Sequence, residues 1–246
     1  MPLAARAQQS AQPVIGFLSS EHPSVMEGRP SAYRKGLAET GYIEGGNVKI
    51  EYRWAEGRYD RLPALVGDLV RQNVALIVAN APAVAHAKEA TKTIPVVFFT
   101  GLDPVKAGLA ASLNRPGGNL TGVGLLNTEL MPKRVELMRE LLPTAKLAGV
   151  LLNPFNPNAE AVKHGAHTAG RALDLQVRFF DARLERDLDG AFLAAAQARA
   201  DGLVIGPDPL FTNYGARLSE LMLQYKLPTI YQFREFAAAR PHELQR

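Results

Sequence analysis

Short apolar runs alternate along this chain with longer stretches in which apolar residues recur every three or four positions. The unbroken run Val14–Leu18 is typical of a buried strand, and residues 60–72 have the apolar spacing of a one-faced helix. Residues 48–54 alternate apolar and polar side chains, which predicts a half-exposed edge strand. The same reasoning predicts further strands at 75–79, 96–99, 120–123, 147–152, 175–180, 202–205 and 228–231, and helices at 24–40, 83–91, 130–142, 157–172, 185–199 and 209–225, with a short helix after Pro104.

Strands that alternate with helices of about ten residues or more indicate parallel sheets covered by helices. A turn cluster at 115–119 separates two such series, and residues 120–123 are expected to cross between them. We therefore predict an α/β fold of two Rossmann-like lobes. The first spans residues 13–123 and the second residues 124–236.

Composition narrows the classes of protein that this chain can represent. Its 246 residues include 28 basic and 24 acidic side chains, without a basic block suited to nucleic acid. No run of about 18 apolar residues is present, so no membrane-spanning helix is expected. The chain has no cysteine, which excludes disulfides, thiolate metal sites and cysteine nucleophiles.

Candidate site residues follow the predicted strands, because ligands bind at the carboxyl ends of parallel strands. Most of them are small, neutral hydrogen-bonding residues, joined by two carboxylates and one tyrosine: Ser19, Ser20, Asn80, Ala81, Pro82, Thr100, Gly101, Leu102, Asp103, Asn153, Phe155, Asn156, Gly206, Pro207, Asp208, Tyr231 and Gln232. Hydroxyls, amides and helix N-termini suit a ligand carboxylate, and an aspartate suits an ammonium group. Each Ser, Asn or Asp has an alternative role as a helix N-cap, above all Asp103 and Asp208, which precede prolines.

Catalytic and metal-binding motifs are not found. The sequence has neither a Walker loop nor a Gly-x-Ser-x-Gly elbow, and the glycine-rich residues 117–122 precede a strand instead of following one. His164 and His167 lie on one predicted helix without an acidic partner nearby, which favours a solvated helix face over a metal site. We expect no metal, no cofactor and no enzymatic activity.

Several segments resemble the ABC-transporter substrate-binding protein family that includes tryptophan-binding lipoproteins. They comprise residues 14–19, 103–105 with 115–123, 153–158, 207–211, and 227–231 with 234–236, in the family's order. The resemblance implies a periplasmic binding protein type I fold that closes on a small ligand. It implies that Ser19, Ser20, Asn80, Ala81 and Asp103 face the cleft from the first lobe, and that Asn153, Asn156, Asp208 and Tyr231 face it from the second.

The sequence also supports separate predictions for the two ends of the chain. Ala5-Arg6-Ala7 fits a signal-peptidase site without the usual apolar region, so residues 1–12 are interpreted as a signal-peptide remnant or a frayed tail. The resembling family continues past Phe236 and returns to its first lobe. Residues 237–246 do not match that continuation, and we expect a first lobe that lacks its closing segment and tends to associate.

The leading hypothesis is thus a periplasmic solute-binding protein that delivers a small polar solute, plausibly an amino acid, to ABC permease subunits in the membrane. Hinge closure of two lobes would enclose the ligand. A complete chain is expected to be a monomer without a nucleic-acid partner. The alternative is an enzyme on a doubly wound α/β fold, such as a nucleotide or sugar transferase, because fold alone does not determine function.

Overall fold

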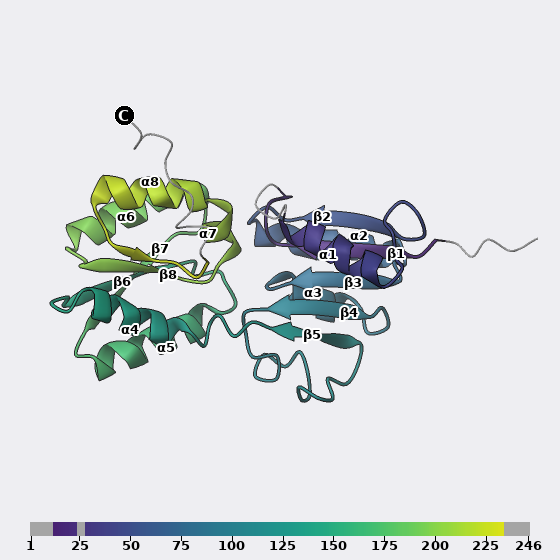
Figure 1. The fold of residues 1–246 in the computed structure, drawn as a ribbon, viewed down its shortest axis with the longest axis horizontal. Coiled ribbons are helices and arrows are strands. Elements are labelled where there is room, and N and C mark those ends of the chain that lie inside the picture. Colours follow the sequence, from purple (N-terminus) through teal and green to yellow (C-terminus); the bar gives the residue numbers. More distant parts are fainter. Residues whose placement is uncertain (1–11, 24–27, 234–246) are drawn as a thin grey trace, which may run out of the picture.

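The computed structural model describes residues 12–23 and 28–233, which form two lobes lying side by side along the long axis of the molecule (Figure 1). The signal-peptide remnant predicted at residues 1–12 lies, except for residue 12, outside the described residues, and so does the tail predicted at 237–246. Within the described part of the chain, no helix is both long enough and apolar enough to span a membrane.

The first lobe is built on a five-stranded parallel sheet of order β2-β1-β3-β4-β5 in the described part of the chain. Its elements are β1 (Val14–Ser19), α1 (Gly28–Glu39), β2 (Lys49–Trp54), α2 (Leu62–Arg71), β3 (Leu76–Asn80), α3 (Ala83–Ala90), β4 (Val96–Thr100) and β5 (Leu120–Gly124). The predicted edge strand at 48–54 is confirmed, because β2 pairs with β1 alone.

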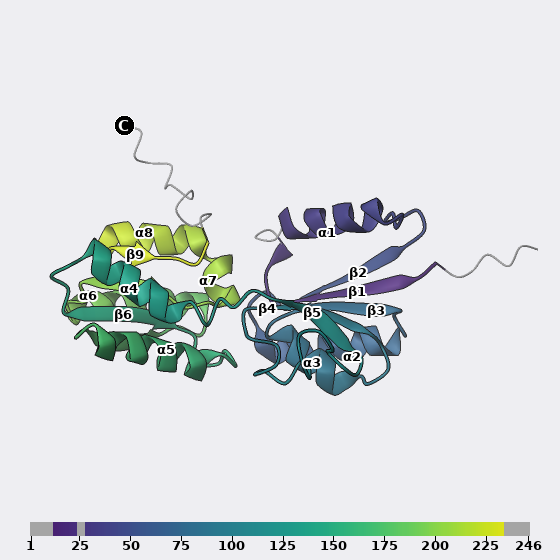
Figure 2. The ribbon, with the colours of Figure 1, turned by 60° about the horizontal axis from the view of Figure 1, so that its bottom comes forward.

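Helices cover the two faces of this sheet unequally. α2 and α3 pack on one face, and α1 lies over β1 and β2 on the other (Figure 2). Beneath α1, the Phe17 ring lies 5.5–5.6 Å from the rings of Tyr33, Tyr52 and Trp54. α1 ends at Glu39, and Gly41 beyond it has a φ of +88°, which permits the left-handed turn that follows the helix.

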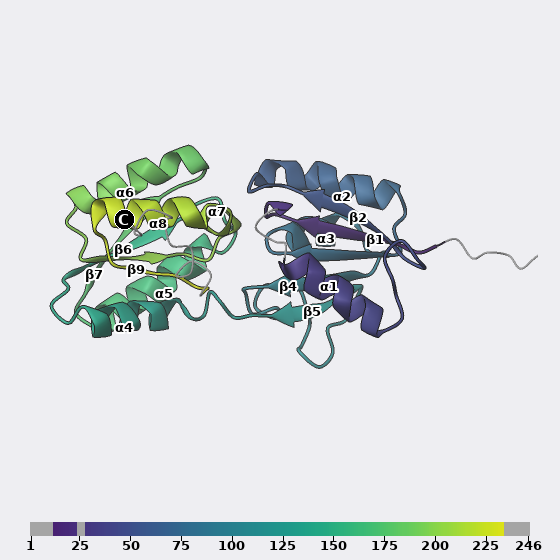
Figure 3. The ribbon, with the colours of Figure 1, turned by 45° about the horizontal axis from the view of Figure 1, so that its top comes forward.

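The second lobe repeats the same plan with a four-stranded parallel sheet of order β7-β6-β8-β9 in the described residues. Its elements are α4 (Met131–Leu141), β6 (Leu147–Leu152), α5 (Ala159–Ala172), β7 (Gln176–Asp181), α6 (Leu188–Gln197), β8 (Gly202–Ile205), α7 (Pro209–Asn213), α8 (Gly215–Tyr225) and β9 (Thr229–Ile230). α4 and α5 bury one face of the sheet, while α6 and α8 bury the other (Figure 3). The predicted α/β fold of two parallel-sheet lobes is confirmed.

Three local predictions differ from the structure. Residues 120–123 do not cross between the lobes, because β5 pairs with β4 and completes the first sheet. The short helix after Pro104 is replaced by turns, since Gly108 adopts a φ of +66° after a single turn. The helix predicted at 209–225 is two helices, because the backbone leaves the helical region at Tyr214 (φ −113°, ψ 31°).

Candidate functional site

The carboxyl ends of both sheets meet at a small cavity between the lobes, with a volume of about 70 Å³. Residues of both lobes line it: Glu21, Asn80, Ala81, Phe99, Thr100, Gly101, Leu125, Asn127, Thr128, Asn156, Asn158, Pro207, Asp208, Pro209, Thr212, Gln232 and Phe233. The strand-end rule therefore led to much of this lining, including Asn80, Ala81, Asn156 and Asp208. The cavity lies where the chain passes from β5 to α4.

Two buried carboxylates give the cavity an acidic character. Glu21 of the first lobe is 5% exposed and Asp208 of the second is 3% exposed. Neither lysine nor arginine occurs among the described residues that line the cavity. The nearby guanidinium of Arg134 is buried and donates to the backbone oxygen of Asn127, 2.8 Å away. A cationic group on a ligand would thus be favoured in the cavity by two negative charges.

Asp208 holds together three parts of the site. Its Oδ1 accepts from the Leu210 backbone N–H at 2.8 Å, so it caps α7, and from Asn153 Nδ2 at 3.3 Å. Its Oδ2 accepts from Asn156 Nδ2 at 2.6 Å and from the Tyr59 hydroxyl, which belongs to the first lobe, at 2.8 Å. A carboxylate has about four lone-pair positions, so these four donors saturate Asp208.

The surroundings of Asp208 raise the pKa values of two side chains, Asp208 itself and Tyr59. Burial raises the pKa of the Asp208 carboxyl above its usual range, although its four hydrogen bonds act in the opposite sense. Burial and the negative charge of Asp208 raise the pKa of Tyr59 well above that of a free phenol. Tyr59 therefore keeps its proton at neutral pH and remains a hydrogen-bond donor to Asp208.

Four predicted residues of the first lobe form the wall of the cavity or support it: Ser19, Ser20, Asn80 and Ala81. Asn80 follows β3, and its Oδ1 accepts from the backbone N–H of Ser20 at 2.9 Å and from the Ser20 hydroxyl at 3.1 Å. The Ser19 hydroxyl accepts from the Glu21 N–H at 3.1 Å and so orients the segment that carries the carboxylate. Ala81 lines the cavity, while Ser19 and Ser20 lie buried behind it.

Three predicted residues, Asp103, Tyr231 and Phe155, do not line the cavity. Asp103 accepts from the backbone N–H groups of Val105 and Lys106, at 2.9 and 3.2 Å, and caps the turn that follows β4. Tyr231 packs against the core of the second lobe, where its hydroxyl lies 3.7 Å from Met222 Sδ. Phe155, which follows β6, is 65% exposed, and the guanidinium of Arg183 lies 4.6 Å from its ring centroid.

Strand-end reasoning missed three residues that shape the site. Glu21 lies one position beyond the predicted pair of serines, and Tyr59 begins a short 3₁₀ helix, Tyr59–Arg61, after β2. Thr128 lies on the passage between the lobes, where no strand pattern points to it. The hydroxyl oxygen of Thr128 and Oε1 of Gln232 are buried and have no hydrogen-bond partner in the described structure. Both atoms are therefore available to a ligand.

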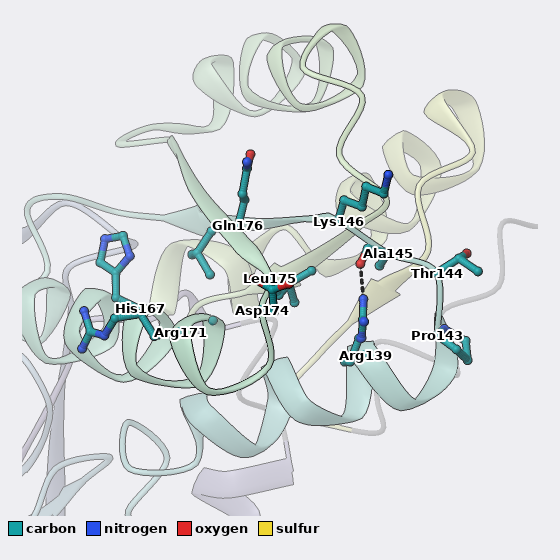
Figure 4. Close-up of a pocket in the computed structure, with 12 residues that line it drawn as sticks. Arg139, Pro143, Thr144, Ala145, Lys146, His167, Arg171, Asp174, Leu175 and Gln176 are labelled. Carbon is teal, nitrogen blue, oxygen red and sulfur yellow. Dashed lines mark hydrogen bonds between the residues drawn. The ribbon is translucent and has the colours of Figure 1, made fainter.

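A larger cavity of about 650 Å³ lies at the far end of the second lobe, at the amino ends of its strands (Figure 4). Arg139, Lys146, His167 and Arg171 surround it, and the Arg139 guanidinium donates to the backbone oxygen of Ala145. Cations commonly stabilise the C-terminal turns of helices, which end here. The convergent polar groups of the cavity between the lobes make that cavity the stronger candidate site.

No group of three His, Asp or Glu side chains is placed to hold a metal ion within residues 12–23 and 28–233. His164 and His167 are exposed on α5, and the His167 ring meets the edge of Phe179 at a centroid distance of 5.1 Å. The two histidines thus occupy a solvated helix face.

Comparisons with known proteins agree on one family. Residues 14–239 match the family described as ABC transporter substrate binding protein. The tyrosine-binding protein of Clostridioides difficile (strain R20291) is 28% identical over 211 residues, which cover 85% of this chain and 60% of that protein. The chain therefore spans less than two thirds of that relative's length.

Two solved structures share the fold. A conserved domain protein from Vibrio cholerae superposes with a TM-score of 0.82 at 24% identity, covering 93% of this chain and 76% of that one. A domain from Streptococcus pneumoniae in complex with L-Trp gives a TM-score of 0.80 at 23% identity, with the same coverage. With its two parallel-sheet lobes and its match over residues 14–239, the chain belongs to the ABC transporter substrate-binding protein family.

Proposed function

We propose that this chain is the solute-binding component of an ABC transporter and that it holds an amino acid in the cavity between its lobes. One observation carries the proposal: two buried carboxylates, one from each lobe, face a cavity whose described lining has no lysine or arginine. Such a site favours a solute with a protonated amine over neutral or anionic solutes. The relatives that bind tyrosine and L-Trp support this choice.

The ammonium group of the solute is placed beside Glu21. Asp208 contributes its charge from close by, but its oxygens already accept four hydrogen bonds and need no further donor. Oε1 of Gln232, buried and without a partner in the described structure, supplies a further acceptor at the same cavity.

The remaining lining suits the other parts of an amino acid. The Thr128 hydroxyl is a donor for the solute carboxylate, and Phe99, Leu125 and Phe233 form an apolar side for its side chain. Ser20 and Asn153 lie behind the lining residues, where Ser20 donates to Asn80 and Asn153 donates to Asp208. Asp103 and Tyr231 have no place in this proposed site.

The proposal includes a cellular role. The protein acts by binding and release without turnover, works outside the cytoplasmic membrane, and delivers its solute to ABC permease subunits. It acts as a monomer and has no nucleic-acid partner. Family membership and the two-lobed fold support the role in solute delivery.

Isothermal titration of the 246-residue protein with amino acids, sugars and purine nucleosides tests the proposal. An amino acid, with tyrosine and tryptophan first in the panel, is expected to bind and to raise the melting temperature, because a ligand stabilises the folded state. Binding of a sugar or a nucleoside without any amino acid would refute it, as would chemical conversion of the bound compound.

Glu21→Gln tests whether the negative charge of Glu21, as distinct from the size of its side chain, contributes to binding. The change keeps the size of the side chain and removes one of the two carboxylates, so amino-acid binding should weaken by about 2 kcal/mol. The matched control is Glu39→Gln at the exposed end of α1, which should leave binding unchanged. Equal affinities of the two variants would remove Glu21 from the site.

A further inference from the structure

Tyr59 and Asn213 each take part in a hydrogen bond that joins the two lobes. The Tyr59 hydroxyl donates to Asp208 Oδ2 across 2.8 Å, and the His22 backbone N–H donates to Asn213 Oδ1 across 2.9 Å. We propose that these two bonds form a latch that holds the lobes together over the solute site and must open before a solute enters. The entry step rests on the proposed function, whereas the latch itself does not.

The first-lobe side of the latch is fixed by the loop after β2. The backbone N–H of Ala55 donates to the Ser19 oxygen at 2.8 Å, and that of Gly57 donates to the Ser20 oxygen at 2.7 Å. These bonds tie the loop to the carboxyl end of β1 and so set the position of Tyr59. Gly57 has a φ of +80°, and a Cβ built there would lie 3.4 Å from Asn213 Nδ2, so the loop approaches the second lobe closely.

The second-lobe side is equally constrained. Asp208 caps α7 and accepts from Asn153 and Asn156, which follow β6. Asn213 ends α7, so both second-lobe partners of the latch belong to one short segment. Because Asp208 also lines the cavity, the latch shares a residue with the wall that a solute would touch.

The dimensions of the cavity show why the latch must open. The arrangement of the lobes in this structure leaves about 70 Å³ between them. Small-molecule pockets measure about 300–1,000 Å³, so an amino acid does not fit without separation of the lobes. On the opposite side of the latch, a groove of about 630 Å³ between the lobes includes Glu56, Glu185 and Tyr214 in its lining. The latch thus divides the space between the lobes into a narrow inner cavity and a wide outer groove.

Removal of the latch is expected to shift the population toward separated lobes. A hydrogen bond to a charged group changes an equilibrium by about tenfold or more. Tyr59→Phe deletes only the donor hydroxyl, and Asn213→Ala deletes the second acceptor. If entry requires separated lobes, either variant should also speed solute association, because the competent fraction of molecules rises.

The absence of cysteine allows a direct measurement of lobe separation. Spin labels on Lys35→Cys in α1 and Gln224→Cys in α8, both exposed positions, report the distance between the lobes in the solute-free protein. Tyr59→Phe should shift the distribution of distances between the two labels toward that of separated lobes. Tyr59→Phe combined with Asn213→Ala should shift it further. Tyr42→Phe makes the same chemical change at an exposed tyrosine of the first lobe and should leave the distribution unaltered.

The outcomes separate the latch from the proposed function. An unchanged distance distribution in both latch variants would refute the latch, whatever the protein binds. A shifted distribution supports the latch even if no amino acid binds. Where tyrosine or tryptophan does bind, faster association in Tyr59→Phe supports the entry step, whereas weaker binding with unchanged association would show that the bonds hold the filled site and would overturn that step.

Discussion

At the carboxyl end of β8, Asp208 caps α7 with one oxygen and reaches Tyr59 of the other lobe with the second. Its Asp-Pro context predicts a helix cap, and its place after a strand predicts a cleft residue. The structure shows that one carboxylate does both, because its two oxygens point to different partners. Asn153 and Asn156 satisfy the remaining acceptor positions, which allows the negative charge to be buried without a lysine or arginine against it.

Substitution of Asp208 should reveal this shared role in stability. Asp208→Ala removes the cap and leaves the Asn153, Asn156 and Tyr59 donors without their acceptor, so the free energy of unfolding should fall by about 3 kcal/mol. Asp208→Ser keeps a capping oxygen and should recover about 1 kcal/mol of that loss. Urea unfolding measures both variants. A loss below about 0.5 kcal/mol in Asp208→Ala would show that the buried carboxylate contributes little.

Asp201 provides a pH-dependent contribution at the other end of β8. Its Oδ2 accepts from the backbone N–H groups of Leu147 and Lys146, at 2.9 and 2.7 Å, and these bonds lower the pKa of the carboxyl. A lowered folded-state pKa stabilises the fold above the unfolded value near 4, and this stabilisation is lost as the pH falls through the folded value.

Asp201→Ala should therefore destabilise the protein by about 1 kcal/mol at pH 7, a small value because the side chain is exposed to solvent. The difference from the parent protein should shrink as the pH falls below 4. Unfolding curves at several pH values check this, and a difference that is constant from pH 7 to pH 3 would contradict the assigned cause.

Among the elements, β5 shows most clearly how close packing selects a residue. Gly122 pairs with Phe98 of β4, and a Cβ at that position would lie 2.0 Å from the Phe98 backbone oxygen. Only glycine fits the approach of the two strands. The sequence pattern at 120–123 is too short to reveal which sheet the strand joins, since that depends on a neighbour more than twenty residues earlier.

Gly122→Ala should separate β5 from β4 and lower the free energy of unfolding by more than about 2 kcal/mol. Gly36→Ala is the matched control, because nothing lies within 4 Å of a Cβ built at this exposed position of α1. A helical glycine costs about 1 kcal/mol relative to alanine, so the control should be slightly more stable than the parent. Chemical denaturation compares the two, and equal effects would contradict the packing argument.

The sequence predicts a helix or a strand well where its apolar periodicity is strong. The strands and helices, their parallel arrangement and the candidate strand ends follow from apolar periodicity. The break at Tyr214 and the turns after Pro104 depend on single backbone angles, which periodicity does not report. Tyr59 and Thr128 escape prediction for a different reason. They lie on connecting segments and reach the site only when the two lobes come together.

For the whole molecule, the candidate site depends on the arrangement of the two lobes. Each lobe supplies one buried carboxylate, so only the assembled pair produces the acidic cavity. The first lobe also leaves part of its sheet open. β5 is an edge strand of the sheet, and its residue Val123 is 60% exposed. Leu125, just beyond the end of β5, is 48% exposed. The association expected for this lobe from sequence remains a prediction.

Exposed apolar residues on an edge strand favour contact between molecules. Val123→Lys places a charge on that strand and should reduce concentration-dependent association, measured by sedimentation velocity. The matched control is Leu141→Lys, which places the same charge at another exposed apolar residue, at the end of α4. Equal effects of the two changes, or none, would show that β5 is not the contact surface.

The most direct test of the acidic site compares solutes that differ only in their amine. Calorimetric titration should show that L-tyrosine or L-tryptophan binds at least about thirtyfold more tightly than its analogue without the amino group, a difference of about 2 kcal/mol. Glu21→Gln should reduce this preference, because one of the two buried carboxylates is then neutral. Equal or tighter binding of the analogue would contradict the central claim that Glu21 and Asp208 select a solute with a protonated amine.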